Sequence, residues 1–255
     1  MSFIKPTKPF ELKGKTIVIP VVSTGNIGQL AVDLIISSLS LERIAILDPQ
    51  YCIPVVGARE DGLEGMTTPL ELYGNPKLEF VVIQQRSPVL KALKQQFIDA
   101  LFAFIKSSEF SSVLFLSGVD LSNRTDSQML TPTYQIRPKN SASVEGSPLA
   151  SLLDLPIPIY TSPTQPLSGQ PTDDSEIPFI PGGGLTRRIL SSIPSGWPIP
   201  TASVLQFVIE GDNRPDAGYL ASVATRILNS DITQWREPTS WRGLFGTPHD
   251  QTLYG

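Results

Sequence analysis

The feature that most constrains the fold of this chain is a repeated alternation of apolar strand patterns with amphipathic helix patterns. A buried strand is predicted over residues 15–22, a helix over about 26–41 and a second strand over 43–48. In the predicted helix, apolar side chains recur every three or four residues and so share one face. A strand, a helix and a strand in close succession are typical of a βαβ unit, whose crossover favours a parallel sheet.

The alternation recurs further along the chain. The predicted elements are, in order, a strand over 79–85, a helix over 88–109, a strand over 111–118, a helix from about 184, a strand over 202–212 and a helix over 215–228. Pro88 is expected to open its helix, because proline suits the first helical turn. Together these elements predict an α/β fold, a three-layer α/β/α sandwich.

Residues 121–178 interrupt this pattern. They are rich in proline, serine, threonine and asparagine, with one short strand candidate at 157–160. A segment of this composition cannot bury enough apolar surface to offset the entropy lost on ordering. Because strand and helix patterns resume afterwards, we expect an irregular Pro/Ser-rich insertion within a single α/β domain over residues 1–246.

The end of the sequence differs from the body. Residues 237–246 predict a short helix whose Trp241, Leu244 and Phe245 dock on the body. Residues 247–255 then lack any apolar periodicity and contain a proline. Such a segment is expected to be a flexible, exposed C-terminal tail.

Charge and cysteine content exclude several classes of protein. The net charge of −4 and the pI of about 5.1 lack the basic footprint of a nucleic-acid-binding protein. No apolar run reaches the length of about 18 residues that a membrane span needs. The first residues do not resemble a signal peptide, and Cys52 is the single cysteine, so we expect a protein of the reducing cytoplasm, and also of the nucleus. Cys52 lies in an apolar stretch and is expected to be a small buried hydrophobe.

The residues that catalysis and metal binding usually need are scarce. The single histidine, His249, falls in the predicted tail, which is a poor place for preorganised acid–base chemistry. Neither a nucleophile elbow nor a zinc-binding pattern is present. We therefore expect no enzyme, no catalytic residue, no cofactor and no metal site.

Two glycine-rich turns leave a choice open. Gly25–Gly28 and Gly182–Gly184 each precede a predicted helix, where backbone N–H groups could hold an anion. Neither turn completes a dinucleotide or phosphate-loop fingerprint, so a tight turn with close packing is the preferred interpretation. After the strand at 202–212, Asp212 or Asn213 is expected to cap the next helix, with Pro215 in its first position.

Four stretches of the chain resemble one known family. Residues 22–39, 179–190, 207–217 and 238–246 are similar, in the same order, to the proteasome assembly chaperone 2 family, and the chain is identified as a fungal-type member. The resemblance implies a Rossmann-like fold related to nucleoside phosphorylases but without their catalysis. It also implies an obligate heterodimer with proteasome assembly chaperone 1. This heterodimer binds the α-ring of the 20S proteasome, promotes correct core-particle assembly and blocks premature binding of activators.

The same resemblance gives the last three residues a role. Family members and proteasome activators can end in a hydrophobic residue, a tyrosine and any residue (the HbYX motif), and this chain ends Leu253, Tyr254, Gly255. In the family, a pocket between α subunits receives this motif and a lysine pairs with the terminal carboxylate. With 6 tyrosines in 255 residues and 40% hydrophobic residues, the pattern arises by chance in about 1% of such chains.

The alternative hypothesis is a nucleoside-phosphorylase-like enzyme or a small-ligand-binding protein that uses the two glycine turns. It predicts a ligand-sized pocket ringed by Gly25–Gly28 and Gly182–Gly184, with polar groups converging in it. A closed or filled site there would count against it.

Overall fold

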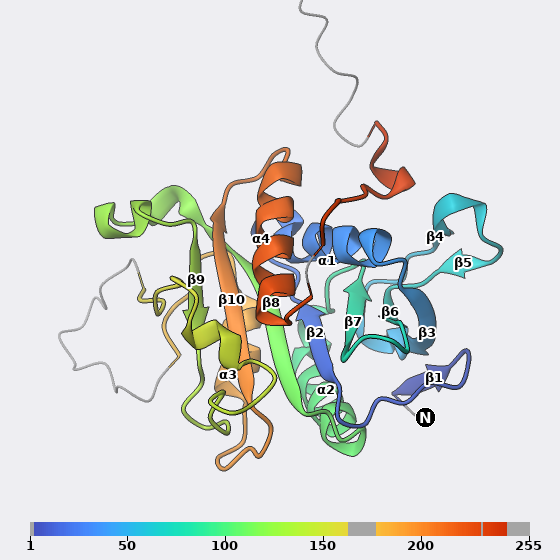
Figure 1. Cartoon of the computed structure of the whole chain (residues 1–255), viewed down its shortest axis with the longest axis horizontal. Helices are drawn as coiled ribbons and strands as arrows, with labels where there is room; N and C mark the ends of the chain where they lie inside the picture. The colour runs from blue at the N-terminus through green and yellow to red at the C-terminus, as the bar shows by residue number, and fades with distance from the viewer. Residues whose placement is uncertain (1–2, 163–176, 231, 244–255) are drawn as a thin grey trace, which may run out of the picture.

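The computed structural model describes residues 3–162, 177–230 and 232–243. Its centre is a sheet of eight strands with helices on both faces (Figure 1). A separate two-stranded arm, β4 (Gly57–Ala58) and β5 (Met66–Thr67), projects beside one end of this sheet. In spatial order the strands of the main sheet are β1 (Ile4–Pro6), β3 (Glu42–Leu47), β6 (Leu70–Gly74), β7 (Phe80–Gln85), β2 (Thr16–Pro20), β8 (Ser112–Asp120), β10 (Thr201–Val208) and β9 (Thr133–Ile136).

The middle of the sheet is parallel and its two sides are antiparallel. β7, β2, β8 and β10 run in one direction. β6, β3 and β1 continue the sheet on one side in antiparallel pairs, and β9 pairs antiparallel with β10 on the other side. All six residues of β7 and all eight of β10 are buried, as expected of strands covered on both faces.

The first predicted βαβ unit is only partly correct. β3 does run in the same direction as β2, but β6 and β7 lie between them, and both hydrogen-bonded neighbours of β3 are antiparallel to it. The short connection over residues 75–79 makes β6 and β7 antiparallel neighbours, and β7 then takes the place beside β2. β6 was not among the predicted strands.

The helices divide between the two faces of the sheet. α1 (Ile27–Ser38) and α4 (Arg214–Ile227) pack on one face, and α2 (Lys94–Ser107) and α3 (Gly184–Ser191) on the other. Three of them match the predicted ranges within a few residues. α2 begins later than predicted, because the chain around Pro88 and Val89 is extended and pairs with residues 51–53. None of the helices in the described ranges is long and apolar enough to cross a membrane.

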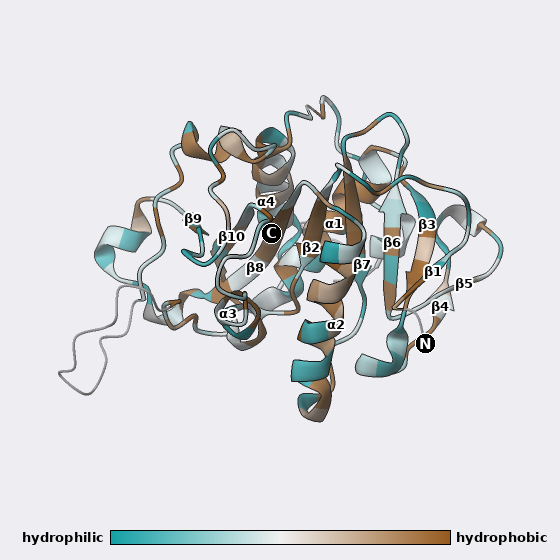
Figure 2. Ribbon diagram, turned by 90° about the horizontal axis from the view of Figure 1, so that it is seen from below, coloured by the Kyte–Doolittle hydropathy of each residue, from teal (hydrophilic) through white to brown (hydrophobic). Residues whose placement is uncertain are grey.

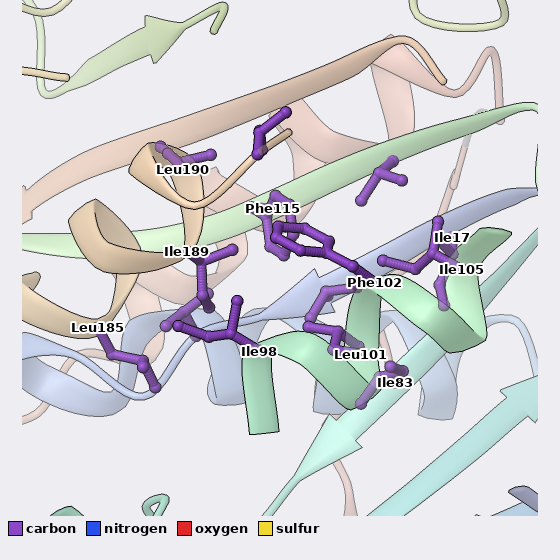
Figure 3. Packing of buried hydrophobic residues seen from close by; sticks show 14 of the residues in the cluster. Ile17, Ile83, Ile98, Leu101, Phe102, Ile105, Phe115, Leu185, Ile189 and Leu190 are labelled. Atoms are coloured by element: carbon purple, nitrogen blue, oxygen red, sulfur yellow. The ribbon is translucent and has the colours of Figure 1, made fainter. Parts of the chain in front are cut away.

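Two hydrophobic cores hold these layers together. Figure 3 shows one of them, in which side chains of α2 and α3 meet those of β2, β7 and β8. Its labelled residues are Ile17, Ile83, Ile98, Leu101, Phe102, Ile105, Phe115, Leu185, Ile189 and Leu190. The second core lies under α1 and α4. In Figure 2 the central strands are mainly hydrophobic, and α2 carries both hydrophobic and hydrophilic residues, as an amphipathic helix should.

The predicted irregular insertion contains more structure than expected. Within residues 121–162 the chain forms β9, the edge strand beside β10, and several single 3-10 turns. The strand candidate at 157–160 forms only an isolated bridge between Ile159 and Gln135. Residues 163–176 of the insertion lie outside the described residues. The strand in this region was therefore predicted at the wrong place.

Candidate functional site

The two glycine turns meet at the carboxyl edge of the parallel strands. Gly25 and Gly28 follow β2, and Gly182 lies so close to Thr24 that a Cβ atom on it would come within 1.9 Å of the Thr24 Oγ1. The backbone N–H of Asp120, at the end of β8, donates to the carbonyl of Pro181 at 2.9 Å. In open α/β sheets this edge is where ligands commonly bind.

Here the protein's own groups fill that edge. Gly25 has a φ of 64°, and its backbone N–H, a donor that an anion would use, donates instead to Glu210 Oε1 at 3.0 Å. A Cβ on Gly25 would lie 2.4 Å from Asn213 Nδ2, and one on Gly28 would lie 2.9 Å from the Leu116 carbonyl oxygen. Three cavities, of about 520, 470 and 200 Å³, are lined by other parts of the chain. The interpretation of these glycines as tight, closely packed turns is confirmed.

The loop before α4 also helps to fill the carboxyl edge of the sheet. Asn213 occupies the N-cap position of α4, but its side chain does not cap the helix. Instead its Nδ2 donates to the carbonyls of Ile209 at 2.9 Å and of Gly25 at 3.4 Å. Asp212 Oδ1 accepts from the backbone N–H of Arg214, and Pro215 is in the first turn. Of the two predicted capping residues, Asp212 therefore caps the helix and Asn213 does not. Asn213 instead connects the loop before α4 to the Gly25 turn by hydrogen bonds.

The C-terminal segment over residues 236–243 docks on α1 and on the loop after β4. Trp241 is 3% exposed and belongs to the core under α1 and α4, so its predicted docking is confirmed. The segment forms one 3-10 turn, Thr239–Trp241, in place of the predicted short helix. The backbone N–H of Arg236 donates to Ser38 Oγ at 2.9 Å. Leu244 and Phe245 lie outside the described residues.

Glu60 fastens this segment by hydrogen bonds. Its Oε2 accepts from Thr239 Oγ1 at 2.7 Å and from the backbone N–H of Ser240 at 3.1 Å. Burial alone would raise the pKa of Glu60, but the hydrogen bonds from Ser240 and Thr239 outweigh it, so this pKa lies below its usual value. The attachment therefore favours the ionised carboxylate.

Asp33 of α1 is a second carboxylate beneath the segment, with the opposite behaviour. Its side chain is 13% exposed, and burial raises its pKa to about 6. Arg86 at 3.5 Å, a hydrogen bond from Gln84 and one from the indole of Trp241 oppose this rise only in part. Asp33 thus contacts Trp241 of the C-terminal segment on one side, and Gln84 of β7 and Arg86 on the other.

A charged cavity of about 520 Å³ opens beside this attachment. Asp33, Glu60, Arg59 and Arg86 line it, together with Pro238 of the C-terminal segment. Its wall also includes Arg43, whose Nη1 lies 2.6 Å from Oε1 of the fully buried Glu71. The phenol of Tyr73 donates to the other oxygen of Glu71 at 2.7 Å; burial first, and then this carboxylate, raise the pKa of Tyr73. The sequence did not indicate this cavity, because its residues come from separate segments of the chain.

Comparison with known proteins places this chain in a family. A sequence profile of the PAC2 family matches residues 17–231. The chain belongs to the PAC2 family. It is 34% identical over 262 residues to human proteasome assembly chaperone 2, covering 96% of each chain. It is 33% identical over 247 residues to the protein of that name from Xenopus laevis, covering 91% of this chain and 92% of the relative.

The solved structures agree on the fold of this PAC2 family member. Pyrococcus furiosus PbaA, described as an archaeal homolog of proteasome-assembly chaperone, superposes with a TM-score of 0.60. The two chains are 17% identical, and the match covers 90% of this chain and 88% of the archaeal one. At that identity the likeness bears on the fold alone.

The family membership also settles the class of protein. The relatives of this PAC2 family chain are named as chaperones of proteasome assembly, so it is placed among chaperones and not among enzymes. The fungal-type assignment gains no specific support. The protein from Saccharomyces cerevisiae matches at 29% identity over only 38% of this chain, less than the vertebrate relatives do.

The remaining predicted site residues have different outcomes. Leu253, Tyr254 and Gly255, and with them His249, lie outside the described residues of this PAC2 family chain. Cys52 is 2% exposed, and burial raises the pKa of its thiol to about 11, so it is the small buried hydrophobe that was predicted.

Proposed function

We propose that this protein is a proteasome assembly chaperone subunit that forms a heterodimer with proteasome assembly chaperone 1 and binds the 20S α-ring. In this role it promotes correct core-particle assembly and blocks premature binding of activators. The observation that carries the proposal is the match to proteins named proteasome assembly chaperone 2 along nearly the full length of both chains. The cytoplasm, and also the nucleus, are the proposed places of action.

The closed carboxyl edge supports a binding role over an enzymatic one. A nucleoside-phosphorylase-like enzyme or a small-ligand-binding protein would need a pocket ringed by the two glycine turns. Glu210 and Asn213 instead satisfy and fill the Gly25 turn, and Thr24 packs against Gly182. This close packing among the described residues counts against the alternative hypothesis, and the proposed relation to the nucleoside-phosphorylase fold concerns architecture alone.

The proposed contact with the α-ring is the HbYX motif, Leu253, Tyr254 and Gly255. Burial of the leucine and tyrosine side chains contributes about 1.5–3 kcal/mol each, and a charge-assisted bond to the terminal carboxylate contributes about 1.5–3 kcal/mol. Ordering each residue of a loose tail costs about 1–2 kcal/mol. One tail alone should therefore bind weakly, and the body of the heterodimer must supply the rest through effective concentration.

The docked C-terminal segment suits this use of the tail. Glu60, Asp33 and Trp241 hold residues 236–243 on the body, so the proposed tail begins close to a fixed point. Residues 244–255 could span at most about 40 Å from that point if fully extended. The proposed organisation is thus a body over residues 1–246 that carries a short tail over 247–255.

Co-purification tests the proposed function. The full chain is expressed with assembly chaperone 1, and the purified complex is mixed with isolated 20S α-rings. We expect a one-to-one heterodimer by light scattering and its co-elution with α-rings. A chain that binds neither protein but gains thermal stability from inosine or inorganic phosphate would overturn the proposal in favour of the ligand-binding alternative.

A further inference from the structure

The arm over residues 53–67, which contains β4 and β5, exposes a group of aliphatic side chains. Val56 is 74% exposed, Met66 63% and Leu63 57%. All three belong to one short segment, which projects beside one end of the main sheet (Figure 1). Single apolar side chains are ordinary on a protein surface, but a group of them on one projecting element is typical of a surface that binds protein.

Hydrogen bonds hold both ends of the arm on the body. At its start, the carbonyl of Ile53 accepts from Ser87 Oγ at 2.6 Å. Near its end, Arg43 Nη1 donates to the carbonyl of Met66 at 2.7 Å. These bonds matter because a two-stranded ribbon alone is only marginally stable in water. The exposed side chains are therefore presented on a fixed support, so less ordering entropy is lost when a partner binds them.

The arm is also attached to the base of the C-terminal segment. Its 3-10 turn Glu60–Gly62 contacts the turn Thr239–Trp241, and Glu60 makes the two hydrogen bonds described above. Figure 1 shows the arm and this segment on the same side of the molecule. The exposed aliphatic side chains therefore lie close to the base of the proposed tail.

The length of the tail limits where its partner can lie. Residues 244–255 span at most about 40 Å when fully extended. A partner that binds Leu253–Gly255 therefore lies within that distance of the base of the C-terminal segment, where the arm projects. Because one tail binds weakly, a second contact with the body is needed, and a contact near the tail gains from its effective concentration. This proximity favours the partner of the tail as the partner of the arm.

We propose that the arm over residues 53–67 is the surface of the body that binds the α-ring, next to the pocket that receives the tail. Val56, Leu63 and Met66 pack on aliphatic side chains of an α subunit. The inference rests on the proposed function and adds to it the part of the body that contacts the ring. The rival occupants of the arm are assembly chaperone 1 and a second copy of this chain.

The affinity of heterodimers for purified α-rings tests the proposal. Val56→Ser and Met66→Ser are combined in the full chain, because both side chains are exposed and the bond from Arg43 uses the backbone of Met66. We expect an intact heterodimer by light scattering and about tenfold weaker binding to α-rings, because less apolar surface is removed from water. The matched control is Leu130→Ser. Leu130 is 89% exposed and precedes β9, at the opposite edge of the sheet, so the affinity should not change.

Photo-crosslinking gives a second measurement that does not depend on affinity. A photoreactive amino acid in place of Val56 should crosslink to an α subunit, and one in place of Leu130 should not. Unchanged affinity of the double variant, loss of its heterodimer, or a crosslink from position 56 to assembly chaperone 1 or to a second copy of this chain would each overturn the proposal.

The wild-type heterodimer separates this inference from the proposed function. If it does not bind α-rings, both are wrong. If it binds them and the double variant binds equally well, the proposed function stands and only the role of the arm is wrong.

Discussion

Two regions of this molecule treat their polar groups in opposite ways. At the carboxyl edge of the parallel strands, Glu210 and Asn213 take up the donors and acceptors of the Gly25 turn, and Thr24 packs on Gly182. Beside β3 and β6, the Nε–H groups of Arg59 and Arg86 are buried without hydrogen-bond acceptors. The place where α/β proteins commonly bind ligands is closed here. The antiparallel side of the sheet instead carries the open cavity and the base of the C-terminal segment.

The difference shows that a chain can have an α/β fold without the ligand-binding site that such folds often have at the carboxyl edge of the sheet. An α/β sheet brings glycine turns to its carboxyl edge in enzymes and in non-enzymes alike. In this chain the first turn is closely packed, because a Cβ on Gly28 of the turn, or on Gly118 of the neighbouring strand β8, would approach a backbone oxygen within 3 Å. The cavity of about 520 Å³ lies instead at the periphery of the sheet, where loops can change without disturbing the core.

The closed edge should be the region most sensitive to small substitutions. In Gly118→Ala the new Cβ would lie 2.5 Å from the Thr24 carbonyl oxygen, a backbone atom that cannot move freely. We expect urea unfolding to show a loss of about 2–3 kcal/mol. The matched control, Gly184→Ala, has no atom within 4 Å of the new Cβ and should change stability by less than about 1 kcal/mol. Similar losses of stability in Gly118→Ala and Gly184→Ala would contradict the close packing of this edge.

The attachment of the C-terminal segment should be sensitive to the loss of the Glu60 carboxylate. Glu60→Ala leaves the Ser240 N–H and the Thr239 hydroxyl without their acceptor. We expect a cost of about 1–2 kcal/mol, seen most directly as faster hydrogen exchange at the Ser240 amide. The exposed Glu64 of the same loop supplies the control, because Glu64→Ala should leave that exchange rate unchanged. An unaltered Ser240 amide in Glu60→Ala would show that the carboxylate does not hold the segment.

The pH dependence of Asp33 should give the smallest effect. The pKa of Asp33 in the folded protein is about 6, above its ordinary value, because burial favours the protonated carboxyl group. The folded state therefore gains stability from this proton in full below about pH 4, and loses that gain as the pH rises through 6. Relative to Asp33→Asn, the wild-type protein should therefore lose about 1 kcal/mol of stability between pH 5 and pH 8. Parallel urea titrations of the two proteins at both pH values measure this difference. A constant difference, or a wild type that gains stability with pH, would contradict the assigned burial of Asp33.

Local pattern was enough to predict the elements whose apolar residues decide their packing. The strand that became β2 and the helices α1 and α4 carry uninterrupted apolar faces, so periodicity alone located them within a few residues. Trp241 was likewise predicted to dock, because the short segment that carries it has enough apolar side chains to pack on the body. These predictions needed no knowledge of distant partners.

The elements that were missed depend on such partners. β6 contains Glu71, which has no exposed surface and whose carboxylate is satisfied by Arg43, Tyr73 and Thr68. β9 contains Gln135, which is buried and donates to the carbonyl of Ile157 at 2.6 Å. Local sequence shows a charge or an amide at these positions but not the group that satisfies it. The cavity escaped prediction for the same reason.

We propose that this chain acts by carrying its C-terminal motif to the proteasome α-ring on a chaperone body. The most direct test compares the affinity for purified α-rings of the full-length heterodimer with that of a heterodimer lacking Leu253–Gly255. We predict that the truncated heterodimer stays intact and binds at least about tenfold more weakly, the loss expected when a charge-assisted contact and two buried side chains are removed. Equal affinities of the two heterodimers would contradict the account.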